Sequence, residues 1–282
     1  MRPRRTTLAV VFMAGAALLA RGEARAAPAY SWLEAEPVRT IADSVEVPAG
    51  FGRVAVAPGS FGDWLRHLPL KPADSGVSLH DGRPVADHGT IAAVVDIDVG
   101  RSDLQQCADA VMRLRAEYLF SRRLTGLIGF ELYSGERYRF AAFAEGVTPV
   151  LSGERIAWRN GPPRDSSHAS LRRWLDTVYA FASTRSLAHE LRPVEDPADV
   201  AIGDVFIHPG SPGHAVIVVD LAVDPATGRK LALLAQSSTP ARDVHILRNT
   251  GDPRLGPWFE LAEGRPFATP GRVFAPNELR RF

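Results

Sequence analysis

Cysteine, lysine and long hydrophobic runs are scarce in this sequence of 282 residues. The single cysteine, Cys107, excludes a disulfide within the chain and a zinc module built from several cysteines. The 33 basic and 32 acidic residues leave a formal net charge of +1, too little positive charge to predict a nucleic-acid-binding protein. After residue 26, no apolar run reaches the roughly 18 residues that indicate a membrane-spanning helix. Hydrophobic residues make up 45% of the chain, which is typical of a globular protein.

The first 26 residues have the three-part pattern of a secretory signal peptide. Arg2, Arg4 and Arg5 form the positive start, Leu8–Ala20 is the apolar run, and Ala24-Arg25-Ala26 is the cleavage site. The apolar run is shorter than the roughly 20 residues of a membrane span, which favours cleavage over the alternative of an uncleaved anchor. We therefore expect a secreted, periplasmic protein that keeps no membrane span after cleavage.

The remaining chain has the pattern of an α+β protein, with an extended arm over residues 27–48 and a single domain over residues 49–282. Apolar residues at helical spacing predict helices, and alternation between turn residues predicts antiparallel strands. Ser60 is expected to cap the first helix, and Ser102 or Asp103 the second. The expected helices cover residues 60–68, 104–121 and 169–190, and the expected strands cover residues 51–56, 91–99, 204–208, 214–223, 230–236 and 244–247, with a hairpin around 134–135.

Cys107 is expected one turn inside the helix over residues 104–121. Near a helix N-terminus, the helix dipole and free backbone N–H groups stabilise a thiolate. The neighbouring Gln106 could donate a hydrogen bond to an oxyanion. The alternative is structural, because Cys107 shares a helix face with Leu104 and Val111, where a cysteine packs as a small hydrophobic residue. The residues alone leave both interpretations open.

His214 opens an apolar strand after a loop rich in glycine and proline, so we expect it at the rim of the sheet. A histidine there could act as a general base toward a nucleophile at a helix N-terminus. Asp220 lies on the same strand but roughly 20 Å along it, too far to orient the imidazole. Gln236, on the strand paired through the turn at 224–228, falls within diagonal reach of His214. A structural role for His214 is the alternative.

Two motifs resemble the NlpC-type cell-wall cysteine peptidases and amidases. They are Gly203-Asp204-Val-Phe-Ile and Gly213-His214-Ala-Val-Ile-Val-Val, followed by a second strand that ends in a polar residue. The resemblance implies a papain-like fold, in which the helix carrying Cys107 packs on an antiparallel sheet. It also implies that Cys107 is the nucleophile, His214 the base and Gln236 the residue that orients the base. It implies no cofactor.

A resemblance over most of residues 50–275 points to the bacterial domain-of-unknown-function family 4846. The residues that carry it are Gly59-Ser60-Phe61 with Leu68-Pro69-Leu70, the run Asp103-Leu-Gln-Gln-Cys-Ala-Asp-Ala-Val-Met-Arg-Leu-Arg-Ala-Glu-Tyr, Gly213-His214-Ala-Val-Ile-Val-Val-Asp, and Leu234-Ala235-Gln236-Ser. This family implies no particular activity.

Other groupings of residues give weaker signals. Asp96 and Asp98 share a strand face, as paired carboxylates for glycoside hydrolysis would, although a role at the strand end is the simpler interpretation. The eight histidines include no close ligand pair, so no metal site is expected; His208 is the residual candidate. The five tryptophans could include an exposed set that stacks on sugar rings.

These observations lead to a hypothesis and two alternatives. The hypothesis is a thiol hydrolase that acts on peptide or amide bonds of the cell envelope, with Cys107, His214 and Gln236 as the catalytic residues and Gln106 at the oxyanion. Its partners would be peptidoglycan or envelope peptides. The first alternative is a non-catalytic periplasmic protein of the same fold that binds or scaffolds the envelope. The second is a glycan-binding module with a row of exposed tryptophans.

Overall fold

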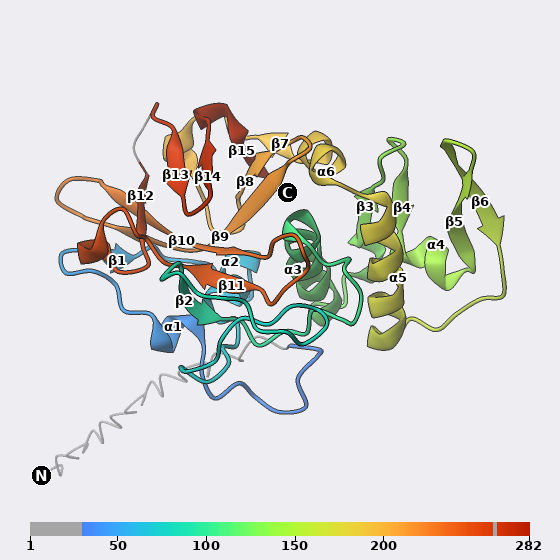
Figure 1. The fold of residues 1–282 in the computed structure, drawn as a ribbon, viewed down its shortest axis with the longest axis horizontal. Helices are drawn as coiled ribbons and strands as arrows, with labels where there is room; N and C mark the ends of the chain where they lie inside the picture. Colours follow the sequence, from blue (N-terminus) through green and yellow to red (C-terminus); the bar gives the residue numbers. More distant parts are fainter. Residues whose placement is uncertain (1–29, 262–263) are drawn as a thin grey trace, which may run out of the picture.

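A nine-stranded antiparallel sheet forms the centre of the protein (Figure 1). The computed structural model describes residues 30–261 and 264–282, so the signal peptide expected over residues 1–26 lies outside them. The strands of this sheet are β1 (Gly52–Arg53), β2 (Ile91–Val94), β7 (Arg192–Pro193), β8 (Val205–His208), β9 (His214–Val223), β10 (Lys230–Gln236), β11 (His245–Leu247), β12 (Phe259–Leu261) and β15 (Leu279–Arg281). Their order is β2-β11-β10-β9-β8-β15-β7, with β1 paired to β9 and β12 paired to β10. The expected α+β class with an antiparallel sheet is confirmed.

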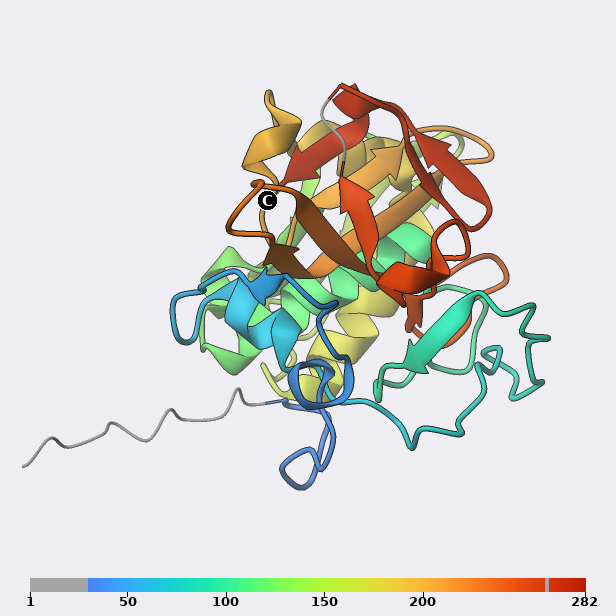
Figure 2. The ribbon, with the colours of Figure 1, turned by 90° about the vertical axis from the view of Figure 1, so that its left-hand side faces the viewer.

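Strand β9 is buried along most of its length because both faces of the sheet are covered. Its residues Ala215 and Ile217 belong to the larger hydrophobic core, whereas Val216 and Val218 belong to the smaller core on the opposite face. The covering elements are α2 (Phe61–Arg66) and α3 (Cys107–Ser121) on the first face, and the hairpin of β13 (Phe267–Thr269) and β14 (Arg272–Phe274) on the second. Figure 2 shows this hairpin, in red, above the sheet. Burial on both faces explains why β9 has a nearly continuous apolar sequence.

The chain around α5 (His168–Phe181) lies at the end of the molecule away from the sheet (Figure 1). The buried face of α5 carries Trp174, whose ring stacks on Phe130 with a centroid distance of 5.9 Å. The remaining helices and hairpin strands are α1 (Ile41–Ser44), α4 (Phe140–Ala144), α6 (Thr184–Glu190), β3 (Gly129–Glu131), β4 (Arg137–Arg139), β5 (Val147–Ser152) and β6 (Arg155–Asn160). Short 3-10 helices are η1 (Thr125–Leu127), η2 (Pro197–Asp199), η3 (Pro253–Leu255) and η4 (Pro276–Glu278).

Several predicted elements differ from the structure for local reasons. The helix expected over residues 169–190 is two helices, because Ser183 is extended and its hydroxyl caps the start of α6. The strand expected over residues 91–99 ends at Val94, since the chain turns toward residues 69–70: Val95 bridges Leu70, and the N–H of Asp96 donates to Pro69. The segment expected as an extended arm contains α1, which begins after Thr40 and is too short to give a helical periodicity.

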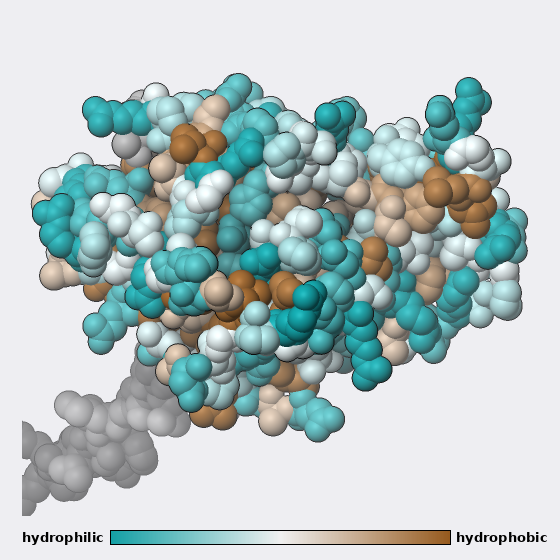
Figure 3. Space-filling view, in the orientation of Figure 1, coloured by the Kyte–Doolittle hydropathy of each residue, from teal (hydrophilic) through white to brown (hydrophobic). Residues whose placement is uncertain are grey.

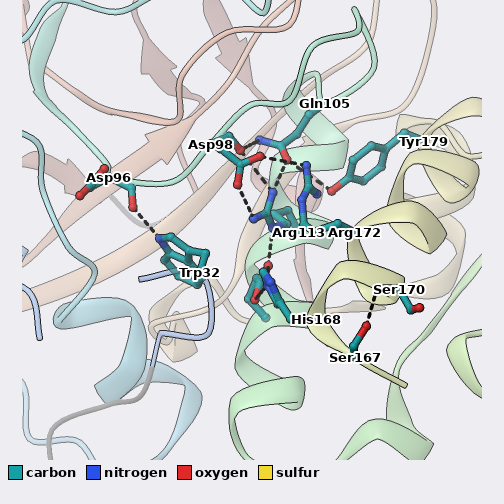
Figure 4. Close-up of polar contacts among 11 residues, drawn as sticks. Trp32, Asp96, Asp98, Gln105, Arg113, Ser167, His168, Ser170, Arg172 and Tyr179 are labelled. Carbon is teal, nitrogen blue, oxygen red and sulfur yellow. Dashed lines mark hydrogen bonds and ion pairs between the residues drawn. The ribbon is translucent and has the colours of Figure 1, made fainter. Parts of the chain in front are cut away.

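A charge cluster, buried at Arg113 and Glu117, joins α3 to the loop that precedes it and to α5 (Figure 4). The guanidinium of Arg113 is fully buried; it donates to Glu117 at 2.7 Å and to Asp98 Oδ1 at 3.0 Å. His168, the first residue of α5, contacts Glu117 through Nε2 at 2.8 Å. Burial by itself would raise the pKa of Glu117, but Arg113 and His168 lower it, so this carboxyl is held in its ionised form.

Arg113 also fixes the loop that leads into α3. Its Nη1 donates to the carbonyl of Asp98 at 3.2 Å and to the side chain of Gln105 at 3.0 Å. Gln105 is buried and lies two residues before Cys107. The cluster therefore determines the path of the chain immediately before the cysteine.

Replacing Arg113 should be strongly destabilising. We expect Arg113→Met to lower the free energy of unfolding by about 3–5 kcal/mol, because Glu117 would be left buried without its strongest partner. Arg229→Met is the control, since Arg229 and Glu260 form an exposed ion pair that should contribute little to the free energy of unfolding. Urea denaturation of both variants measures the difference. Equal losses in the two variants would contradict the role given to Arg113.

Candidate functional site

Cys107 is the first residue of α3, not a residue one turn inside it. Neither predicted cap, Ser102 or Asp103, starts the helix, and the carboxylate of Asp103 instead accepts from the backbone N–H of Ala241 at 2.6 Å. The helix begins instead after Gln106, whose backbone N–H donates to Asp109 Oδ2 at 3.0 Å. Cys107 therefore lies in the first turn, where N–H groups have no partner within the helix and the dipole favours a thiolate.

A pocket of about 450 Å³ lies in front of this first turn. Its lining includes Cys107 and Asp109 from α3, Tyr179 from α5, Thr184 from α6, and the loop over residues 210–213. The cysteine is only 7% exposed. Burial raises the pKa of the Cys107 thiol, while the backbone N–H of Ala215 acts in the opposite direction. The resting thiol is accordingly neutral at pH 7.

His214 and Gln236 form the pair expected from the hairpin register. Ala235 on β10 lies opposite Ile217 on β9, so Gln236 is diagonal to His214 on the same face of the sheet. The imidazole Nε2 lies 2.7 Å from the amide Oε1 of Gln236. Burial lowers the pKa of His214, and the hydrogen bond to Gln236 partly offsets that effect. The imidazole is therefore mostly neutral at pH 7.

Cys107 and the side chain of His214 lie on opposite faces of the sheet at the start of β9. The thiol lies near the backbone of Ala215, the residue after His214, and the side chain of Ala215 belongs to the core beneath α3. The His214 ring instead stacks on Phe274 of the smaller core, with a centroid distance of 6.2 Å. Within residues 30–261 and 264–282, no hydrogen bond joins the sulfur to the imidazole. The structure thus brings His214 to Gln236, and Cys107 to the neighbouring backbone.

Gln106 lines the same pocket and is held at both ends of its amide. Its Nε2 donates to Asp103 at 3.2 Å, and its Oε1 accepts from the hydroxyl of Thr239 at 2.9 Å. One hydrogen of the NH₂ group has no role in these two contacts, so Gln106 can still donate to a ligand. Its expected place at an oxyanion stays a prediction.

Two residues of this region were missed by sequence reasoning. Asp109 is 8% exposed, lines the pocket beside Cys107, and has a pKa that burial raises to about 8. His245 lies opposite Gln236 on β11 and contacts its amide at 3.3 Å. Gln106 and Asp109 have the spacing of a capping box, in which the residue before a helix pairs with the third residue of that helix. This spacing could have located both the helix start and Asp109.

The weaker candidates have other partners. Asp98 is engaged by Arg113 and Arg172, so Asp96 and Asp98 do not form a pair of free carboxylates. Asp220 binds Arg53 and Arg66, each at 2.7 Å.

The histidines and helices give no further site. His208 pairs with Glu278. No group of three or more ligating side chains suited to a metal ion occurs in the described part of the chain. None of its helices is both long and apolar enough to cross a membrane.

The tryptophans do not form an exposed row in the residues the structure describes. Trp64, Trp174 and Trp258 are fully buried, and Trp32 is partly buried. Trp158, on the β5–β6 hairpin, is 37% exposed and donates to Glu136. Figure 3 shows a small hydrophobic area over that hairpin, at the right-hand end. The geometry that the glycan-binding alternative requires is therefore missing.

Comparison with known proteins leads to one family. No curated protein and no solved structure matches this chain. The model of the family described as domain of unknown function 4846 matches residues 41–281, which include α1, the central sheet and the pocket at Cys107. The resemblance expected from the sequence motifs is thereby confirmed: the chain belongs to the domain-of-unknown-function family 4846.

Proposed function

We propose that this protein is a thiol hydrolase that cleaves peptide or amide bonds of the cell envelope. The observation that carries the proposal is the arrangement at the start of β9. There, His214 is hydrogen-bonded to Gln236 and directly precedes Ala215, whose backbone lies near the Cys107 thiol. The proposal is also supported by the position of the cysteine at the start of a helix that packs on an antiparallel sheet, one strand of which opens with histidine.

The hydrogen bond to Gln236 defines the roles of the two imidazole nitrogens. Because Nε2 of His214 donates to the amide oxygen, Nδ1 carries no proton and can accept the proton of the Cys107 thiol. The sulfur then attacks the carbonyl carbon, and the C–N bond breaks as the imidazolium returns its proton to the leaving amine. Water hydrolyses the resulting thioester and restores the thiol. In the resting protein the ring lies on Phe274, on the opposite face of the sheet from Cys107, so this step requires a rearrangement at the open start of β9 that brings the imidazole to the sulfur.

The start of α3 offers donors for the negative charge that develops on the carbonyl oxygen. Backbone N–H groups of the first helical turn have no partner within the helix, and Gln106 lines the same pocket. Hydroxyls of Thr184 and Thr239 border this space, which suits a polar peptide. The expected signal peptide favours an envelope location, where peptidoglycan peptides are an abundant source of such bonds.

A specific observation favours the second candidate, a non-catalytic protein that binds or scaffolds the envelope. Cys107 is nearly buried, its pKa is raised, and the His214 ring rests against an apolar side chain. In that case Cys107 and His214 would be packing residues. Enzymatic and chemical tests on Cys107 separate the two candidates.

Cleavage of envelope peptides should depend on the three proposed residues. We expect the protein without its leader to release new amino termini from peptidoglycan fragments, detected by mass spectrometry. Cys107→Ala and His214→Ala should each reduce the rate by about a thousandfold or more, since the nucleophile and base act as a unit. Gln236→Leu should reduce it less. Cleavage that persists in Cys107→Ala would exclude the proposal.

The reactivity of the thiol toward iodoacetamide should also depend on His214. Because burial raises the pKa of Cys107, alkylation at pH 7 should be slow and should increase above the ordinary thiol value of about 8.5. If His214 can turn to accept the thiol proton, His214→Ala should slow alkylation at pH 7 further. A thiol that reacts only when the protein unfolds, with or without His214, would favour the binding protein.

Asp109 should make the stability depend on pH. Its pKa of about 8 in the folded protein exceeds the value of about 3.9 in an unfolded chain, so the folded state alone keeps the proton between these values. The free energy of unfolding should therefore fall as the pH rises from about 4 to about 8. Asp109→Asn retains an acceptor for Gln106 but removes this dependence, so its stability relative to the parent should increase with pH.

The control for Asp109 is Asp103→Asn. The pKa of Asp103 is lowered by its hydrogen bond from Ala241, so this carboxyl is ionised in both states above about pH 5. Its replacement should leave the slope between pH 5 and pH 8 unchanged. Urea denaturation across this range measures both variants. A slope that Asp109→Asn does not change would refute the assignment of a protonated Asp109.

A further inference from the structure

A second histidine lies behind the proposed pair of His214 and Gln236. His245 opens β11, and its register partner on β10 is Gln236. The Nε2 atoms of Gln236 and His245 are 3.3 Å apart, and Nδ1 of His245 lies 2.9 Å from the carbonyl oxygen of Asp243. His245 is only 4% exposed, so its ring cannot exchange these partners for water. The mechanism proposed above gives His245 no role.

The carbonyl of Asp243 determines the position of every proton along this chain of contacts. A carbonyl oxygen only accepts, so Nδ1 of His245 must carry a hydrogen. In a neutral ring the other nitrogen, Nε2, is then an acceptor, and Gln236 must turn its NH₂ group toward it. The amide oxygen of Gln236 consequently faces His214, whose Nε2 must donate.

The neutral form of His245 is the one favoured by its surroundings. Burial lowers its pKa, and the charge of Arg242 acts in the same direction. The carbonyl of Asp243 and the carboxylates of Asp243 and Asp87 act against this effect without reversing it. On the side of β11 away from β10, the register partner of His245 is Val94 of β2.

We propose that His245 is a positioning residue that fixes the tautomer of His214 through Gln236. An amide has nearly the same shape in its two orientations, so Gln236 alone could present either its oxygen or its NH₂ group to His214. With His245 behind it, only one orientation satisfies all three side chains. The result is a His214 ring with hydrogen on Nε2 and a free Nδ1. Only the use of that Nδ1 to accept the Cys107 proton rests on the proposed function.

The test is the protonation state of each ring nitrogen, observed by ¹⁵N NMR of histidine-labelled protein at pH 7.5. His214 and His245 are assigned with His214→Ala and His245→Leu. In the parent protein we expect hydrogen on Nε2 of His214 and on Nδ1 of His245. Hydrogen on Nδ1 of His214 or on Nε2 of His245 would overturn the proposal.

Two substitutions then test whether His245 causes the tautomer. His245→Leu keeps an apolar side chain of similar size but removes the acceptor, so the ¹⁵N signals of His214 should report a mixture of tautomers. His189→Leu, at an exposed histidine, is the control and should change neither signal. An unchanged His214 tautomer in His245→Leu would overturn the proposal.

Cleavage assays separate this inference from the proposed function. If the two amide orientations become equally populated, about half of the His245→Leu molecules lack the competent tautomer, so kcat should fall by about twofold or more with KM unchanged. A tautomer that depends on His245 in a protein that cleaves no envelope peptide would support the positioning role and reject the hydrolase. Cleavage of envelope peptides together with a His214 tautomer that is independent of His245 would support the hydrolase and reject the positioning role.

Discussion

Coverage of β9 on both faces is the constraint on which the candidate site depends. A strand between two cores has little freedom to shift or to turn, since either motion would open a cavity in close-packed material. The side chain at each position is therefore directed to one core or the other. At the open end of β9 this rule brings the backbone of Ala215 to the thiol of Cys107, and the ring of His214 to the face shared with Gln236. The site lies where the two cores end.

The charge cluster under α3 complements this constraint. Fully burying the guanidinium of Arg113 is costly, and the cost is offset only because Glu117, Asp98 and Gln105 together use its donors. These partners come from α3 itself and from the loop before it. A network that satisfies a buried charge holds its members in one arrangement, so the segment that leads to Cys107 follows a single path.

The parts of the site that the sequence predicts are those set by local pattern. Alternation along β9 and β10 and the turn between them were enough to place Gln236 within reach of His214, because the register of a hairpin follows from its turn. The cap at Ser60 was likewise predicted from adjacent residues and is present.

The parts that the sequence did not predict depend on contacts between distant segments. The start of α3 shifted to Cys107 because Asp103 binds the backbone of Ala241, a contact between residues far apart in the chain. His245 contacts Gln236 only because their strands pair. The helical pattern around Arg113 does not predict that this arginine is buried. The sequence shows that an arginine is present, but it does not show which distant residues pair with it.

The burial of Cys107 also bears on the oxidation of the chain's only thiol. Peroxides and disulfides react with the thiolate, so a thiol whose pKa is raised by burial is converted slowly to a sulfenic acid or a mixed disulfide. With no second cysteine in the sequence, an oxidised Cys107 could not be resolved by a partner within the chain. In the oxidising compartment that the expected signal peptide implies, the pocket would therefore preserve the reduced sulfur until a ligand or a turn of the imidazole draws off its proton.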